Sequence, residues 1–180
     1  MTVRGGDARV DEVFEPATGD GPQVTGPGRD AEVRTAFEGL LRIRRVTNAT
    51  GGEGMPAPWE LNRAVRAVSL ALEASGFPPS AVAAVAADDA GQAGQAGQAG
   101  QAGQADHAAR RTATGYRVRP GERPRTVYVE WLGPPGGGAA QEEETRLKAC
   151  AEVLTGLGWE ALLYRGPRKR RFLEVEPGVG

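Results

Sequence analysis

The sequence contains very little of the chemistry that enzymes and metal sites use. Among its 180 residues there is one cysteine, Cys150, and one histidine, His107. A single cysteine excludes an intrachain disulfide and is typical of a reducing compartment. A Cys/His zinc site is excluded as well, because such sites need several of these ligands close together. We therefore expect neither a metal nor a cofactor.

Long apolar runs are also absent. No stretch approaches the roughly 20 apolar residues of a membrane-spanning helix, and the first residues lack the apolar region of a signal peptide. We expect a cytoplasmic protein that makes no membrane contact. Arginine outnumbers lysine by twenty to two. This bias favours a GC-rich bacterial genome and weakens any functional argument from arginine counts.

Glycine and proline, in contrast, are plentiful, with 27 and 13 residues. They cluster before residue 30, in 51–58, in 91–103 and in 133–138. The first of these clusters, and the Ala/Gly/Gln repeat at 90–105 that contains the third, have few large apolar side chains. Such segments bury too little apolar surface to offset the entropy of ordering. We predict a disordered acidic tail over 1–29. The remainder, 30–180, is predicted to be a single domain interrupted by a flexible insertion at about 78–113.

Three segments have the apolar spacing of amphipathic helices. The first covers 31–46. The second begins at Pro58 and ends before Gly76, where a glycine followed by an aromatic residue is typical of a helix C-terminus. The third covers about 140–157. It carries Cys150 in its apolar stripe, so we interpret this cysteine as a small buried hydrophobe.

Two units of the same kind follow one another along the chain. Each consists of a helix, a glycine, an aromatic residue (Phe77 or Trp159), and two strands joined by an arginine-rich turn. The strands are predicted over 116–119, 127–130, 162–165 and 173–176. We interpret the two units as a tandem duplication. The expected fold is α+β: a two-layer sandwich of a four-stranded antiparallel sheet with two helices on one face, plus an extra N-terminal helix.

Strand alternation assigns the side chains to two faces. Those expected to face the helices are Val118, Val127, Val129, Trp131, Leu162, Tyr164, Leu173 and Val175. Those expected to face away are Arg117, Arg119, Tyr128, Glu130, Leu163, Arg165, Phe172 and Glu174.

Tyr128, Leu163 and Phe172 make this second face a candidate partner surface, and three interpretations of it are open. In the first, the helix at 31–46 packs over it as a second core. In the second, it binds a protein or another copy of the chain through its aromatic and apolar side chains. In the third, nucleic-acid bases stack on the aromatic rings while arginines hold phosphates, against the repulsion of the glutamates on the same face.

The two hairpin turns are rich in cations. They contribute the candidate contacts for an anion or a nucleic acid: Arg119, Arg123, Arg125, Arg165, Arg168, Lys169, Arg170 and Arg171. Arginines that contact phosphates supply affinity that is independent of sequence. The competing interpretation is that basic turns only keep the protein in solution and block edge-to-edge aggregation.

No pattern indicates an active site, and we expect no catalytic residue. His107 follows the Ala/Gly/Gln repeat, where nothing positions it. The glycine-rich stretches lack the lysine and the strand–helix context of a phosphate-binding loop. We therefore expect a non-enzymatic binding or accessory protein whose partner is a protein or a second copy of the chain. The alternative is a nucleic-acid-binding accessory protein that uses the turns 119–125 and 165–171.

Overall fold

The computed structural model describes residues 14–83 and 111–178. Its helices are α1 (Arg29–Thr47), η1 (Gly52–Gly54), α2 (Pro58–Leu61), α3 (Ala64–Ala74), α5 (Ala139–Gly156) and η3 (Pro167–Lys169). Its strands are β1 (Ala81–Val82), β2 (Arg111–Ala113), β3 (Gly115–Pro120), β4 (Val127–Leu132), β5 (Trp159–Arg165) and β6 (Arg171–Pro177).

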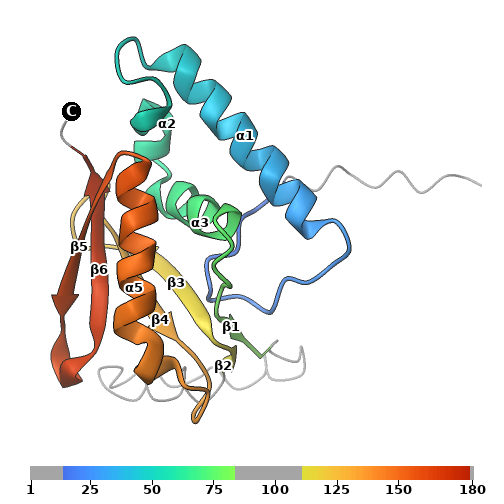
Figure 1. Ribbon diagram of the computed structural model, residues 1–180, viewed down its shortest axis with the longest axis vertical. Coiled ribbons are helices and arrows are strands. Elements are labelled where there is room, and N and C mark those ends of the chain that lie inside the picture. Colours follow the sequence, from blue (N-terminus) through green and yellow to red (C-terminus); the bar gives the residue numbers. More distant parts are fainter. Residues whose placement is uncertain (1–13, 84–110, 179–180) are drawn as a thin grey trace, which may run out of the picture.

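Four strands form one antiparallel sheet in the order β3–β4–β6–β5 (Figure 1). Helices α3 and α5 lie on the same face of this sheet, α5 against β4, β5 and β6 and α3 against β3. Their apolar side chains meet those of the strands in one core, which includes Val68, Leu72, Trp131, Leu147 and Leu173. The mixed α+β class expected from the sequence is confirmed.

The predicted second helix is divided into α2 and α3. It begins at Pro58 as expected, but the backbone of Arg63 has φ −133° and ψ 44°, which interrupts the helix. The predicted end is confirmed: Gly76 has a φ of 83°, and the N–H of Phe77 donates to the carbonyl of Leu72 at 3.1 Å. This hydrogen bond closes α3 as a Schellman motif.

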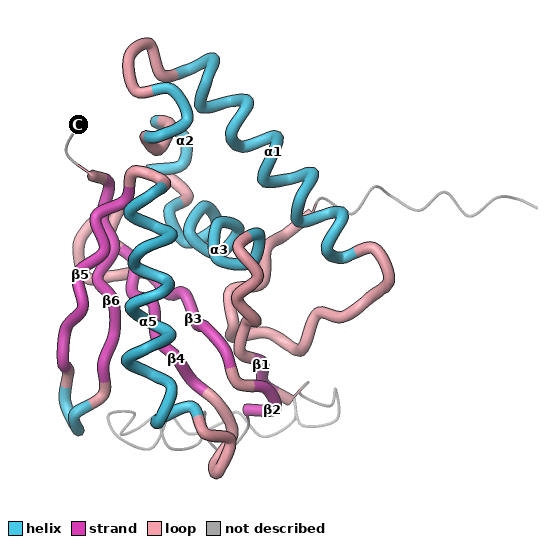
Figure 2. The backbone as a smooth tube through the Cα atoms, in the orientation of Figure 1, coloured by secondary structure: helices cyan, strands magenta, loops and turns pink. Residues whose placement is uncertain are grey.

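Helix α1 packs on the helix layer and not on the far side of the sheet (Figure 2). Its Val33 and Leu40 form a second buried cluster with Leu70 of α3, and Phe14 and Phe37 pack against this cluster. The interpretation in which this helix covers the second face of the sheet is therefore wrong. The physical reason is that α3 is apolar on two sides, one for the sheet and one for α1.

A buried ion pair attaches α1 to α2. Arg44 is 1% exposed, and its Nε and Nη2 donate to the two carboxylate oxygens of Glu60, each at 2.7 Å. Its Nη1 donates to the carbonyl oxygens of Glu53 at 2.9 Å and Leu157 at 2.8 Å. Because Leu157 directly follows α5, this one guanidinium also links α1 to the start of β5.

Residues 14–28 form a segment without regular secondary structure that is bonded to the domain. The carbonyl of Thr18 accepts a hydrogen bond from the N–H of Val118 at 2.7 Å, and the carbonyl of Ala17 accepts one from the hydroxyl of Tyr116 at 2.8 Å. Here the structure departs from the predicted tail over 1–29, of which residues 1–13 lie outside the described part. Main-chain hydrogen bonds, the ion pairs of Glu15 and Asp20 and the packing of Phe14 attach this segment to the domain, and the composition of the segment does not reveal these partners.

The ends of the predicted insertion at 78–113 also belong to the fold. Ala81 and Val82 of β1 pair with Ala113 and Arg111 of β2 in a two-stranded sheet. The structure therefore differs from the prediction at both ends of this segment, because backbone pairing fixes them. The Ala/Gly/Gln repeat itself lies outside the described residues.

Candidate functional site

The side of the sheet that faces away from α3 and α5 is called the outer face here. The cross-strand registers place eleven side chains on it: Arg117, Arg119, Tyr128, Glu130, Leu132, Glu160, Leu162, Tyr164, Phe172, Glu174 and Glu176. No described helix covers it.

The orientation of β5 on this face is the reverse of the predicted one. Leu163 pairs with the buried Leu173 and Tyr164 pairs with Phe172, and directly opposite residues share a face. Leu163 and Arg165 therefore lie on the helix side, whereas Leu162 and Tyr164 lie on the outer face. The cause is Trp159, which begins β5 with a side chain only 1% exposed and so turns the odd-numbered residues toward the helices.

An aromatic cluster occupies the middle of the outer face. The Phe172 ring lies 5.1 Å from Tyr128 in an edge-on arrangement and 5.9 Å from Tyr164 in a stacked one. The guanidinium of Arg119 lies 4.6 Å from the centre of the Tyr128 ring. Toward β5 the cluster opens to solvent, since Tyr164 is 44% exposed and Leu162 is 48% exposed. Tyr164 and Leu162 are the members of this surface that the sequence interpretation missed.

Acidic side chains gather at one end of the same face. Glu160 and Glu176 stand directly opposite each other on β5 and β6, and like charges in this arrangement repel. Arg123, from the β3–β4 turn, forms ion pairs with Glu174 and Glu176. The hydrogen bond with Glu174 and the charge of Glu176 raise the pKa of Arg123. Glu160 forms no ion pair with any described residue, so this end of the face keeps an excess of negative charge.

The two basic turns lie at opposite ends of the sheet. Strands β4 and β6 are antiparallel neighbours, with Val127 paired to Val175 and Val129 to Leu173. The β3–β4 turn at 121–126 therefore lies beside the end of β6, while the β5–β6 turn at 166–170 lies at its start. The structure does not bring the predicted cations together as one patch.

Four of the eight predicted cations, Arg119, Arg123, Arg170 and Arg171, already have acidic partners. Arg119 pairs with Glu130 at 3.2 Å. Arg170 and Arg171 approach Glu143 at 3.5 and 3.7 Å, which joins the β5–β6 turn to the first turns of α5. Their charge is thus largely neutralised within the protein.

Three of the predicted cations are exposed and form no ion pair with a described residue: Arg125, Arg165 and Lys169. The side chain of Arg168 is outside what the structure describes. These side chains are the ones left to contact an external anion.

The titratable side chains of the core are not reactive. Burial raises the pKa of the Cys150 thiol to about 12, so that the nucleophilic thiolate is scarce near neutral pH. Burial, and then the charge of Glu73, raise the pKa of Tyr116, whose hydroxyl donates to the carbonyl of Ala17. Neither group is suited to act as a nucleophile or general base.

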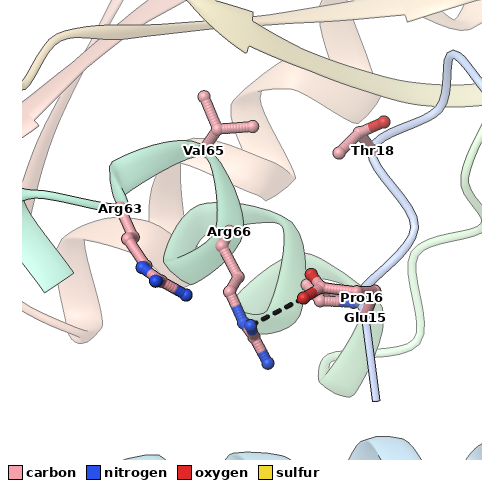
Figure 3. Close-up of a pocket in the computed structure, with 6 residues that line it drawn as sticks. All are labelled: Glu15, Pro16, Thr18, Arg63, Val65 and Arg66. Atoms are coloured by element: carbon pink, nitrogen blue, oxygen red, sulfur yellow. Dashed lines mark hydrogen bonds and ion pairs between the residues drawn. The ribbon is translucent and has the colours of Figure 1, made fainter. Parts of the chain in front are cut away.

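A hollow of about 320 Å³ lies between the N-terminal segment and α3 (Figure 3). Arg66 reaches into it and donates to the carboxylate of Glu15 and to the carbonyl of Phe14, both at 2.8 Å. Because Arg66 neutralises this carboxylate, the lining supplies no free base. The hollow is a gap beside the attached segment, with no arrangement of groups that indicates catalysis.

Within the described ranges, no group of three or more His, Cys, Asp or Glu side chains could hold a metal ion. None of the described helices combines the length and the apolar character needed to cross a bilayer. Comparisons with protein families, curated proteins and solved structures found no match to this chain. A functional proposal therefore has to come from the geometry of the chain itself.

Proposed function

We propose that this protein is a non-enzymatic accessory protein of the cytoplasm that binds a partner protein on the outer face of its sheet. The observation that supports this most is the cluster around Phe172, with Tyr164 and Leu162 each about half exposed. Exposed apolar groups that adjoin polar ones mark interaction sites, and tyrosines are prominent among the residues that contribute most to binding.

The charges of the face specify the chemistry of the partner. Glu160 stands opposite Glu176 on β6, and like charges in this arrangement repel; Arg123 pairs with Glu176, whereas Glu160 has no ion-pair partner among the described residues. A basic side chain of the partner beside Glu160 would neutralise this carboxylate while apolar neighbours cover Leu162 and Tyr164. The partner that fits is therefore a protein segment that presents apolar side chains next to an arginine or lysine.

Nucleic-acid binding through the basic turns is the alternative, and it has less support. A duplex or a strand would have to contact cations at opposite ends of the sheet and displace the glutamates that hold Arg123 and Arg171. The exposed Arg125, Arg165 and Lys169 are what favours this alternative.

Two variants separate these functions. The face variant, Tyr164→Ser/Phe172→Ser, removes the exposed part of the cluster, and the turn variant, Arg125→Gln/Arg165→Gln/Lys169→Gln, removes three exposed cations. A display library of peptides with apolar residues beside arginine or lysine is selected on the wild-type protein. We expect the selected peptides to bind the turn variant normally and the face variant at least about tenfold more weakly, a difference of about 1.4 kcal/mol.

The alternative is tested with the same proteins. Labelled DNA and RNA are titrated at two salt concentrations, because phosphate contacts make affinity salt-dependent. Salt-sensitive binding that the turn variant loses and the face variant keeps would contradict the proposal. Failure of the wild-type protein to select any peptide of the stated chemistry would contradict it too.

We also infer that the units α3–β3–β4 and α5–β5–β6 derive from one ancestral unit. They have the same element order, and their second strands, β4 and β6, are neighbours in the middle of the sheet. Gly76 and Gly158 follow the two helices with φ of 83° and 81°, and each is followed by an aromatic residue, Phe77 or Trp159. A two-fold relation of this kind accounts for the placement of the basic turns at opposite ends.

A further inference from the structure

The two edges of the four-stranded sheet differ in how they are covered. At the β3 edge, the N–H of Val118 donates to Thr18 and the N–H of Tyr116 donates to Pro78, while Ser80 donates to the Tyr116 carbonyl. The N-terminal segment and the chain before β1 thus occupy this edge. Strand β5 forms the other edge, and Figure 1 shows no described segment beyond it.

The hydrogen-bond pattern identifies the groups that β5 leaves unpaired. Gly178 donates to the Gly158 carbonyl before the strand, and Gly166 donates to the Arg170 carbonyl after it. The register between these points is constant, and in an antiparallel ladder every second residue bonds to the neighbouring strand. The even-numbered residues of β5 therefore bond to β6. The odd-numbered residues, Trp159, Ala161, Leu163 and Arg165, direct their N–H and C=O groups outward.

The side chains of β5 do not protect this edge. Sheet edges are usually blocked by proline, by a bulge or by charged residues in the strand. Here the strand reads Trp-Glu-Ala-Leu-Leu-Tyr-Arg without proline or irregular pairing. Its charged residues, Glu160 and Arg165, lie near the two ends, and between them Leu162, Leu163 and Tyr164 are 48%, 37% and 44% exposed. An open edge of this kind is suited to pairing with another strand.

We propose that β5 pairs antiparallel with β5 of a second copy of this chain, centred on Leu162, so that two sheets join into one. This register brings each outward-directed odd residue opposite another, Trp159 opposite Arg165 and Ala161 opposite Leu163. It pairs the whole strand with itself, and it keeps the outer faces of the two sheets on the same side.

The side-chain pairs of this register are compatible. On the helix side, the small Ala161 leaves space for Leu163 of the second copy. On the outer face, Leu162 meets its own counterpart and Glu160 stands opposite Tyr164. Centring the pairing on Glu160 instead would place two carboxylates face to face, which is unfavourable. In this register β5 is complementary to itself: it pairs over its whole length, apolar side chains meet apolar ones on the same face, and no two like charges lie opposite each other.

The proposed dimer forms through the edge of the sheet and does not depend on partner binding at the outer face. Dimer formation would also make the two aromatic clusters parts of one continuous surface. Phe172→Ser alone, on β6, changes no residue of β5, so it should remain dimeric.

A cysteine cross-link tests the register. Residues opposite each other in a non-hydrogen-bonded pair have Cα atoms about 4.5 Å apart, which is within the range that a disulfide spans. We expect Leu162→Cys to form a disulfide-linked dimer under mild oxidation. The control is Tyr164→Cys, whose two copies would lie roughly 14 Å apart along the strands and should not cross-link. The native Cys150 is fully buried and does not compete.

A proline substitution tests the edge by a second route. Leu163→Pro removes one outward-directed N–H per copy, and proline is tolerated at such positions of edge strands. Its control, Leu163→Thr, keeps the N–H. Light scattering should give twice the 18.8 kDa chain mass for the wild-type protein and Leu163→Thr, and a single chain mass for Leu163→Pro with an unchanged circular dichroism spectrum.

Three outcomes would overturn the proposal: a monomeric wild-type protein at micromolar concentration, a Leu163→Pro protein that remains dimeric, or cross-linking at Tyr164→Cys rather than Leu162→Cys. If Leu163→Pro does not fold, the wild-type mass and the cysteine pair decide by themselves.

Discussion

Replacing Arg44 by methionine should destabilise the protein far more than any exposed arginine replacement. The methionine keeps much of the apolar volume but removes four hydrogen bonds, two of them to Glu60. Glu60 is fully buried, and after the substitution its carboxylate would keep only the N–H of Ala57, at 2.9 Å, as a partner. The variant therefore leaves a buried charge without its counter-ion.

The expected loss follows from that geometry. Removing one partner of a buried ion pair costs about 3–5 kcal/mol, while a domain is stable by only about 5–15 kcal/mol in total. At about 2–4 °C per kcal/mol for a chain of this size, the melting temperature should fall by roughly 6–20 °C. Arg45→Met is the control on the same helix, because Arg45 is 64% exposed and pairs with Glu53. It should change stability by less than about 1 kcal/mol.

The assay is urea unfolding followed by circular dichroism for the two single variants, for Glu60→Gln and for Arg44→Met/Glu60→Gln. The double variant should regain more than half of the loss, because a neutral amide needs no counter-ion and its oxygen can still accept from Ala57. The reasoning is refuted if Arg44→Met is no less stable than Arg45→Met. It is refuted as well if the double variant is no more stable than Arg44→Met.

Four further predictions concern single features of the chain. Arg125 has a φ of 67°, a left-handed backbone conformation that glycine adopts more easily than other residues. Arg125→Gly should therefore stabilise the protein by about 1 kcal/mol in urea unfolding. Glu122→Gly, in the same turn but without a positive φ, should destabilise the protein. Cys150 should resist a thiol reagent in the folded protein and react fully in denaturant, and rapid labelling of the native protein would show that the core is open. The hydrogen bond from Lys148, and then the charge of Arg171, lower the pKa of Glu144. The ionised Glu144 carboxylate therefore stabilises the folded protein at neutral pH, and this contribution is lost as the pH falls through the folded-state pKa. Glu144→Gln should be less stable than the wild-type protein at pH 7 and equal to it in strong acid. Deleting residues 91–105 should leave the melting temperature unchanged, and a substantial fall would show that the repeat contributes to the fold.

The sequence predicted the helix ends and the strands that depend on residues close together in the chain. The end of α3 at Gly76 was predictable because a left-handed glycine and a following aromatic residue are needed to close a helix there. The four strands of the larger sheet were placed within a few residues because alternation and arginine-rich turns bound them, whereas β1 and β2 lie at the ends of the predicted insertion and were not predicted. The position of α1 was not predictable. This helix packs against Leu70 of α3, and the sequence does not indicate which element an apolar residue such as Leu70 will contact.

The candidate site was predicted in part. Tyr128 and Phe172 lie on the outer face as expected, because valines fix the alternation of β4 and β6. In β5, Leu162, Leu163 and Tyr164 are three consecutive apolar residues, and alternation among them is ambiguous. Only the distant anchor Trp159 sets their orientation. The pairing of the basic turns with glutamates was equally hidden, because these partners come together only through the tertiary fold.

The pairing of Val82 with Arg111 holds the two ends of the connection between β1 and β2 side by side. Once two ends are held together, the entropic cost of a longer connection grows slowly, by about 0.6 kcal/mol for each doubling of length. The stretch between β1 and β2 can therefore change length over evolution at little cost to stability. It is also the natural place to insert a reporter domain, because β1 and β2 lie beyond the β3 side of the sheet, away from β5 (Figure 1).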